Sequence, residues 1–117
     1  MKRKNKLVSY MDSILSSATF GGTFSHYQNK QIIYSQGHPA DTVFYIREGA
    51  VRLTTRSKYL SSPSAVTAIL GVGDIFGELC LGGFPYRVST AVTLTASIIQ
   101  VIKKESMIRM LRDDNKF

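Results

Sequence analysis

The sequence predicts a mainly β protein: an antiparallel β-roll, a double-stranded barrel of the jelly-roll type, flanked by a short α-helix at each end. Short runs rich in β-branched and aromatic residues recur from residue 23 to residue 103, as expected for strands. Clusters of glycine, proline and serine separate these runs and mark turns. Helical spacing of apolar residues occurs before and after this region, which predicts a helix at each end of the roll.

The N-terminal part of the chain combines a basic tail with an amphipathic segment. Four of the 15 lysines and arginines lie in residues 1–6, which we expect to form a disordered tail. Residues 7–19 are predicted to form a helix because apolar side chains recur on one face. These side chains are Leu7, Tyr10, Met11, Ile14, Leu15 and Ala18.

The β-roll is expected to span residues 22–103. Residues 43–46 are apolar on both faces, which predicts a central strand. Val51 and Leu53 alternate with polar residues, as in a half-buried strand. The candidate strands are residues 23–27, 31–35, 42–47, 50–56, 65–70, 87–95 and 97–103.

The last predicted element is a helix over residues 104–113, whose apolar face carries Met107, Ile108 and Leu111. A chain of 117 residues has room for one domain, which we assign to residues 7–117.

One stretch, residues 75–86, interrupts the strand rhythm with three glycines, a proline and a single acid, Glu78. We expect a tight turn at Gly77 and one helical turn over residues 78–81. Helix N-termini favour anions, and glycine lets a ligand approach the backbone closely. Arg87 can clasp two phosphate oxygens, and an ionised Glu78 accepts from a sugar hydroxyl. From their spacing alone, the two residues are equally explained as a surface salt bridge.

Two longer runs resemble a known family. GVGDIFGELCL at residues 71–81, followed by RVSTA at 87–91, is similar to the phosphate-binding cassette of cyclic nucleotide-binding domains. YSQGHPADTVFYIREGAV at residues 34–51 resembles the first strands and turns of that family. The similarity is greatest to the sensor domains of bacterial regulators of the cyclic-AMP receptor and fumarate–nitrate regulator (Crp/Fnr) superfamily, whose fold is a β-roll flanked by helices.

The resemblance implies a role for each residue of the cassette. Gly77 and Leu79 would offer backbone contacts, and Glu78 would accept from the ribose 2′-hydroxyl. Cys80 occupies the place of a small residue whose backbone N–H meets the phosphate, and Arg87 would bind the phosphate. The candidate ligand-binding residues are therefore Gly77, Glu78, Leu79, Cys80, Arg87, Val88 and Ser89.

Val88 departs from the family pattern, which often has serine, threonine or alanine directly after the arginine. Valine supplies no hydroxyl to the phosphate, and Ser89, one position later, is expected on the other face of the strand. Since threonine at this position favours cyclic GMP in the family, the resemblance implies cyclic AMP as the ligand.

Composition argues against several other functions. The basic residues outside the tail are spread among strands, so the net charge of +7 does not predict direct DNA binding by this chain. No apolar run approaches the roughly 20 residues that span a bilayer. His26 and His38 lack a His-x-His pair and a supporting carboxylate, so we expect no metal and no enzyme activity. A single cysteine, Cys80, gives no disulfide framework, and we expect a cytoplasmic protein.

The resemblance therefore implies a ligand-sensing regulatory domain that binds a cyclic nucleotide and controls an attached or partner transcription-regulatory module. Family regulators continue into a dimerisation helix and a DNA-binding domain, neither of which we find in this sequence. We therefore expect either a fragment of a regulator or a stand-alone sensor domain. A homodimer is a further possibility that the sequence leaves open. The alternative is a β-roll of the same family that has lost nucleotide binding and senses another signal or acts as an interaction or dimerisation unit. A small β-barrel metalloenzyme is a third hypothesis, and it predicts bound metal.

Overall fold

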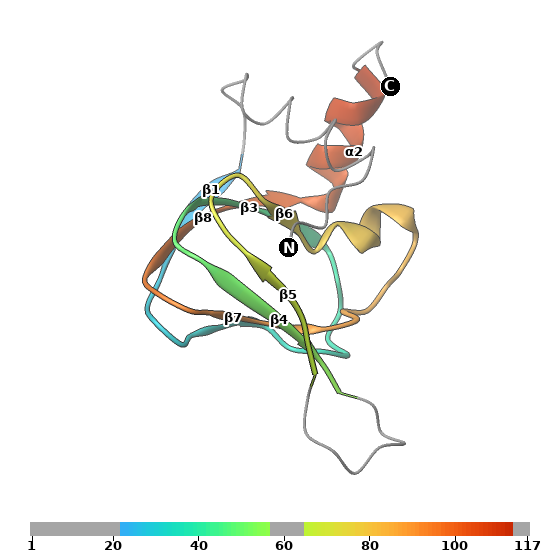
Figure 1. Ribbon diagram of the computed structural model, residues 1–117. Coiled ribbons are helices and arrows are strands. Elements are labelled where there is room, and N and C mark those ends of the chain that lie inside the picture. The colour runs from blue at the N-terminus through green and yellow to red at the C-terminus, as the bar shows by residue number, and fades with distance from the viewer. Residues whose placement is uncertain (1–21, 57–64, 114–117) are drawn as a thin grey trace.

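The computed structural model describes residues 22–56 and 65–113. They form two antiparallel sheets that enclose a core, with a helix and a short helical turn at one end (Figure 1). The elements in chain order are β1 (Thr23–Tyr27), β2 (Ile32–Tyr34), β3 (Thr42–Glu48), β4 (Val51–Thr55), β5 (Ala65–Leu70), β6 (Ile75–Phe76), the 3-10 turn η1 (Glu78–Gly82), β7 (Thr90–Thr93), β8 (Ser97–Lys103) and α2 (Lys104–Asp113).

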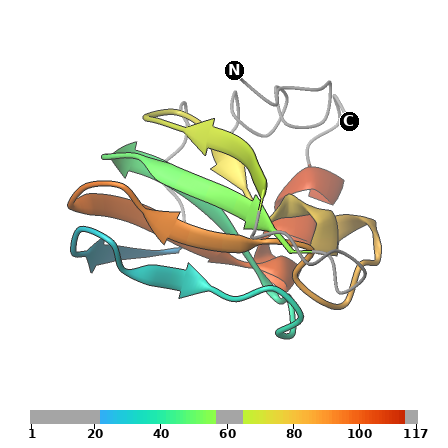
Figure 2. The ribbon, with the colours of Figure 1, turned by 60° about the horizontal axis from the view of Figure 1, so that its bottom comes forward.

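Each sheet has four strands. Sheet A has the order β1-β8-β3-β6, and sheet B has the order β2-β7-β4-β5. Figure 2 shows the strands of sheet B one above another, with η1 and α2 gathered at one end of the roll. This arrangement confirms the predicted antiparallel β-roll and its C-terminal helix, and β1, β5, β8 and α2 have the predicted bounds. The predicted tail 1–6 and helix 7–19 lie outside the described residues.

Strand β6 was not expected, because its two residues, Ile75 and Phe76, belong to the stretch that we interpreted as a turn. The structure pairs Phe76 with Phe44 and Ile75 with Tyr45 on β3. Both β6 residues are at most 2% exposed. A two-residue strand is too short to show an alternating pattern, so only its pairing with β3 identifies it.

Strand β3 is central, as its apolar sequence predicted, because both of its faces are covered. Phe44 and Ile46 face the core between the two sheets. Val43 and Tyr45 face a second core on the other side of sheet A. That second core is formed with α2 and η1 by Ile75, Cys80, Ile102, Met107 and Leu111.

The core between the sheets contains three aromatic rings close to η1. Phe44 and Phe76 stack with ring centroids 5.0 Å apart. Tyr34 lies tilted against them at 5.5 Å from Phe44 and 6.1 Å from Phe76. Offset aromatic contacts of this kind add about 0.5–1.5 kcal/mol beyond the burial of the rings. These rings therefore pack as one group in the core between the sheets.

In the part of the chain that the structure describes, no helix has the length and apolar character that crossing a membrane requires.

We predict that Phe76→Ala lowers the free energy of unfolding by about 3–5 kcal/mol, since it empties a buried ring position. Phe84→Ala is the matched control, because Phe84 is 52% exposed whereas Phe76 is fully buried, and it should change stability by under about 0.5 kcal/mol. Urea denaturation followed by circular dichroism measures both changes. Equal effects of the two substitutions would contradict this description of the core.

Candidate functional site

The backbone of Arg87 is fixed against the turn at Gly37 and His38. The Arg87 N–H donates to His38 O at 2.8 Å, and the Gly37 N–H donates to Arg87 O at 2.8 Å. The preceding residue, Tyr86, forms an isolated antiparallel bridge with Pro39. Arg87 therefore projects from a well-anchored backbone although it lies outside the regular strands.

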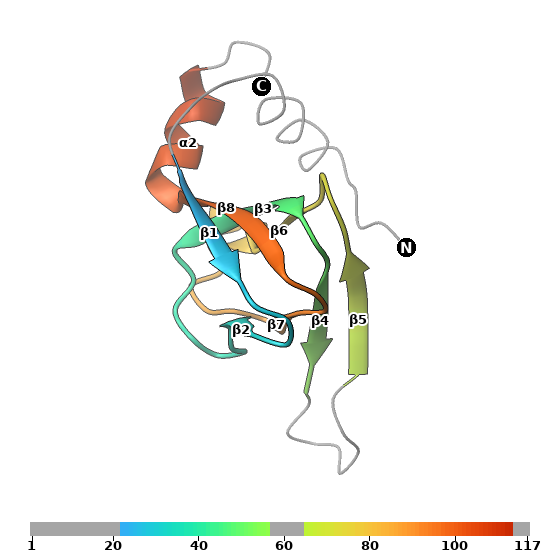
Figure 3. The ribbon, with the colours of Figure 1, turned by 90° about the vertical axis from the view of Figure 1, so that its left-hand side faces the viewer.

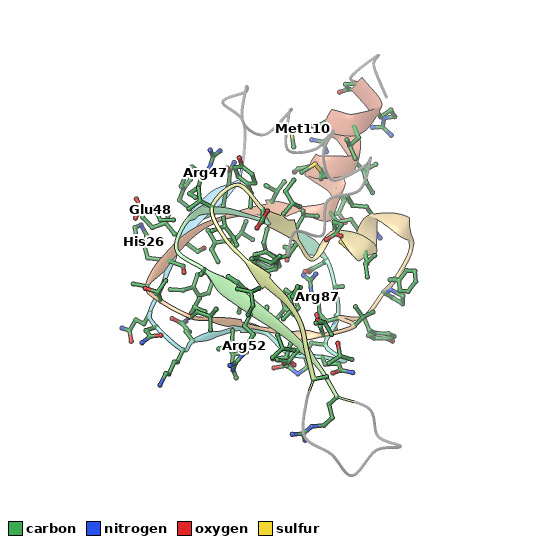
Figure 4. All side chains as sticks on the ribbon, in the orientation of Figure 1. His26, Arg47, Glu48, Arg52, Arg87 and Met110 are labelled. Atoms are coloured by element: carbon green, nitrogen blue, oxygen red, sulfur yellow. The ribbon has the colours of Figure 1, made fainter. Side chains whose placement is uncertain are left out.

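The side chain of Arg87 turns inward and is only 6% exposed. Its Nη1 donates to Gly77 O at 3.1 Å, and its Nη2 donates to Thr42 O at 3.0 Å and to Thr42 Oγ1 at 2.8 Å. The guanidinium carbon lies 4.3 Å from the ring centroid of Tyr34 and 5.3 Å from that of Phe44. At these distances the face of an aromatic ring attracts a cation. Figure 4 shows Arg87 on the side of the roll opposite Arg47, Glu48 and His26.

One donor of Arg87 is unsatisfied. Its Nε is buried and has no hydrogen-bond partner among the described residues, a condition that costs about 1–3 kcal/mol. The acceptors at the terminal nitrogens are carbonyl and hydroxyl oxygens. An anion that reached Nε would supply the missing acceptor together with a negative charge, and charge-assisted hydrogen bonds are the stronger kind.

Gly77 brings the backbone of the cassette next to Arg87. Its φ is 75°, in the left-handed region that favours glycine. A Cβ at this position would lie 2.9 Å from Arg87 Nη1 and 2.9 Å from Phe44 Cδ2. No other residue type fits here without displacing the guanidinium or the ring. The predicted turn at Gly77 is confirmed, and the predicted helical turn is the 3-10 turn η1.

The residues around Arg87 line one open pocket. Its empty volume is about 360 Å³, including the space at the mouth that opens to solvent. Glu78 and Ser89 are buried in its wall, at 5% and 6% exposed. The structure thus brings all seven candidate ligand-binding residues together. The lining residues are Tyr34, Ala40, Leu53, Gly77, Glu78, Leu79, Cys80, Tyr86, Arg87, Val88 and Ser89.

The strand predicted over residues 87–95 is shorter in the structure. That strand was the basis for placing Ser89 on the other face from Val88, since neighbouring strand side chains alternate between faces. The structure begins β7 at Thr90, and residues 88 and 89 form a bend. The bend brings both Val88 and Ser89 into the pocket lining, with Ser89 buried and Val88 45% exposed. The contrast in exposure agrees with the expectation that the two side chains face different ways, and the position of the Ser89 hydroxyl stays a prediction.

Cys80 is a packing residue at the back of the pocket. It is 1% exposed, and its Sγ lies 3.4 Å from Gly77 O and 3.7 Å from Thr42 O, so its single S–H can donate to either oxygen. Burial raises the pKa of this thiol, while the positive charges of Arg87 and Lys104 lower it to a smaller extent. A thiol with a raised pKa stays protonated at neutral pH, which makes it a poor nucleophile.

Sequence reasoning missed several residues of the site. Thr42 anchors the guanidinium through two oxygens, and Tyr34, Ala40 and Leu53 belong to the lining. They come from β2, β3, β4 and the loop before β3, far from the cassette in sequence, and no local motif marks them. Leu53 and Tyr34 both pair with Ala91 on β7, and this pairing brings them close to Arg87. Only the structure shows these pairings.

Residues 22–56 and 65–113 contain no group of three or more histidine, cysteine, aspartate or glutamate side chains that could hold a metal ion. His26 lies on β1 and His38 in the turn that binds the Arg87 backbone.

The comparisons with known proteins agree with this geometry. The model of the cyclic nucleotide-binding domain family matches residues 24–114. The Drosophila melanogaster protein "cGMP-dependent protein kinase, isozyme 2 forms cD5/T2" is 32% identical over 89 residues, which are 74% of this chain and 9% of the kinase. The chain thus spans less than a tenth of the length of the curated relatives that it matches.

Solved structures share the fold. The sensor domain of the transcriptional regulator DNR from Pseudomonas aeruginosa superposes with a TM-score of 0.74 at 18% identity, over 82% of this chain and 63% of that one. The EAL enzyme Bd1971 has been solved in a cAMP-bound form, with a TM-score of 0.70, 23% identity and coverage of 80% and 25%, and in a cGMP-bound form. By its matched residues this chain belongs to the cyclic nucleotide-binding domain family, with the fold of the sensor domains of Crp/Fnr-type regulators.

Proposed function

We propose that the pocket binds a cyclic nucleotide and that Arg87 binds its phosphate. The observation that carries this proposal is the buried Nε of Arg87, which has no hydrogen-bond partner among the described residues and belongs to a pocket-lining side chain. A cyclic phosphate is a singly charged anion with several acceptor oxygens. It supplies what this guanidinium lacks, at a site where the terminal nitrogens and the aromatic rings already hold the arginine in place.

The other cassette residues take complementary roles in this proposal. Glu78 is buried at the pocket wall, and an ionised carboxylate accepts from a ribose hydroxyl but repels a phosphate, so the sugar and the phosphate are oriented in opposite directions. Gly77 and Leu79 offer backbone N–H groups at the start of η1, where a helical turn has no internal acceptors for them, and Cys80 takes the backbone role that the family resemblance gives it.

We favour cyclic AMP as the ligand because Val88 offers no hydroxyl directly after Arg87. Ser89 is among the residues that line the pocket, so we test its hydroxyl as a candidate contact. The relatives that match in sequence are cGMP-dependent kinases, so both nucleotides belong in the test.

We also propose that this domain is regulatory and controls an attached or partner transcription-regulatory module. DNR, which shares its fold, is a transcriptional regulator. The kinase and Bd1971 are enzymes of which the matched region is a small part. Cys80 of η1 would transmit ligand binding to the C-terminal helix, because it packs in one cluster with Met107 and Leu111 of α2. A ligand that moves η1 therefore shifts the packing of α2 as well.

The alternative is a β-roll of this family that binds no nucleotide, and one observation favours it. The terminal nitrogens of Arg87 are already hydrogen-bonded to Thr42 and Gly77, so the guanidinium is held without a ligand. The calorimetric test below separates the two functions.

For Arg87→Lys we expect an affinity for cyclic AMP at least about tenfold lower, because lysine keeps the charge but loses the planar fork that clasps a phosphate. Isothermal titration of cyclic AMP and cyclic GMP into the wild type and the variant measures this change. Arg56→Lys is the matched control, since Arg56 is exposed and lies outside the pocket. If the wild type gave no binding heat at near-millimolar nucleotide, the proposed function would be refuted. If Arg87→Lys bound cyclic AMP as tightly as the wild type, the phosphate would bind at another residue.

Gly77→Ala should lower both stability and nucleotide affinity, because a Cβ there collides with Arg87 and Phe44. The left-handed backbone alone costs a non-glycine residue about 1–2 kcal/mol. Gly82→Ala is the control, since an added Cβ at Gly82 meets nothing within 4 Å. Urea denaturation and nucleotide titration of both variants measure the effects. If Gly77→Ala behaved like Gly82→Ala, the close approach at Gly77 would have no functional importance.

Ser89→Ala should weaken nucleotide binding about tenfold, the value of one hydrogen bond to a charged group at the low end of its range. Ser35→Ala is the control, because Ser35 lies outside the pocket lining. The same titration, run with both nucleotides, reports whether the hydroxyl serves the shared phosphate or one base. Full affinity of Ser89→Ala for both nucleotides would remove Ser89 from the site.

A further inference from the structure

The described residues that line the pocket include two aromatic side chains, Tyr34 and Tyr86, and their surroundings differ. The ring of Tyr34 packs against the stacked rings of Phe44 and Phe76. The guanidinium carbon of Arg87 lies 4.3 Å from the centroid of the Tyr34 ring. Tyr86, in contrast, is 59% exposed, so its side chain stands where the pocket meets solvent. Tyr34 therefore serves to hold the arginine, whereas Tyr86 is accessible to a ligand.

Tyr86 belongs to an apolar rim at the mouth of the pocket. The rim consists of Leu79, Tyr86 and Val88, which all line the pocket and are 43%, 59% and 45% exposed. Leu79 comes from η1, and the other two flank Arg87 in the chain. Arg87 itself is 6% exposed, so its charge lies deeper than the rim. A buried cation behind an apolar mouth suits a ligand with an anionic group at one end and a flat apolar group at the other.

The backbone of Tyr86 is held in place without a ligand. Tyr86 forms an antiparallel bridge with Pro39, and the Ala40 N–H donates to the O of the preceding residue, Pro85, at 2.9 Å. Figure 3 shows the segment between η1 and β7, in light orange, beside the segment that links β2 to β3. Tyrosine has only two side-chain torsions to order, so a contact with this ring carries a small entropic cost.

We propose that the base of the bound cyclic nucleotide points to the mouth of the pocket and stacks on the ring of Tyr86. This inference rests on the proposed function and adds the direction of the ligand, with the phosphate at Arg87 and the base at the apolar rim. Stacking on an aromatic side chain uses the face of a base, and every base has one. Tyr86 therefore contributes equally to the binding of cyclic AMP and cyclic GMP.

The test is isothermal titration of the full chain with cyclic AMP, with cyclic GMP and with the 3′,5′-cyclic phosphate of methyl riboside, which has no base. Tyr86→Ala removes the ring, and Tyr86→Phe keeps the ring without its hydroxyl. Phe84→Ala is the matched control. Phe84 is an aromatic residue of similar exposure, 52%, two positions before Tyr86, and it is not among the described residues that line the pocket. Circular dichroism verifies that the variants are folded.

For Tyr86→Ala we expect an affinity for both nucleotides about tenfold lower, as for the loss of one stack between a base and an aromatic ring. Its affinity for the base-free phosphate should equal that of the wild type. Tyr86→Phe and Phe84→Ala should bind all three ligands like the wild type. The wild type should bind the base-free phosphate about tenfold more weakly than cyclic AMP, because that ligand cannot stack.

The inference is overturned if the wild type binds the base-free phosphate as tightly as cyclic AMP. It is also overturned if Tyr86→Ala weakens the base-free phosphate as much as the nucleotides, or if Phe84→Ala has the same effect as Tyr86→Ala. In these cases the proposed function survives as long as Arg87→Lys weakens binding of the base-free phosphate. If the wild type binds none of the three ligands, the proposed function fails together with this inference.

Should Tyr86→Ala unfold, nuclear Overhauser effects in the wild type saturated with cyclic AMP decide. The ring protons of Tyr86, assigned by comparison with Tyr86→Phe, must show effects to H2 or H8 of the bound adenine. Absence of these effects refutes the stacking.

Discussion

The site depends on one interaction, the clamp that holds the Arg87 guanidinium between the two sheets. Its acceptors come from Thr42 at the start of β3 and from Gly77 just before η1, and the rings of Tyr34 and Phe44 face its carbon atom. Three segments, namely β2, β3 and the residue before η1, thus converge on one cation. Burying an arginine is unfavourable unless its donors and charge are compensated. Among the described residues the Nε of Arg87 has no hydrogen-bond partner, a state that it shares with the Nε of Arg52, and we propose a ligand phosphate as its acceptor.

The same arrangement connects the pocket to the C-terminal helix. Cys80 has its backbone in η1 at the pocket wall and its side chain in the cluster that contains Met107 and Leu111. Its raised pKa and full burial suit a packing role. In our proposal, a ligand that displaces η1 acts on α2 through this shared packing, because densely packed cores transmit strain. Binding and signalling would then share one side chain.

Much of the fold and of the candidate site could be predicted from the sequence, because the patterns that identify them lie within short stretches of the chain. Turn residues and alternation located β1, β5 and β8, and a run of glycines around Glu78 located the cassette. The features that the sequence did not predict depend on pairing between residues that lie far apart in the chain. Strand β6 is too short to have a pattern. Strand β7 begins at Thr90 rather than at residue 87, since the backbone of Arg87 is bonded to the turn at Gly37 and His38 instead. Thr42 was missed for the same reason, since only the fold brings it to the guanidinium.

The central claim is our proposal that the Nε of Arg87, which has no hydrogen-bond partner among residues 22–56 and 65–113, donates to the ligand phosphate. The most direct measurement is the ¹⁵N–¹H correlation of the arginine Nε–H groups, recorded during a titration with cyclic AMP. The account predicts that the Arg87 Nε–H signal, assigned by its absence in Arg87→Lys, moves to the position of a strongly hydrogen-bonded donor, while the signals of Arg47 and Arg52 stay in place. Saturation of the pocket with no change at Arg87 Nε–H would contradict it.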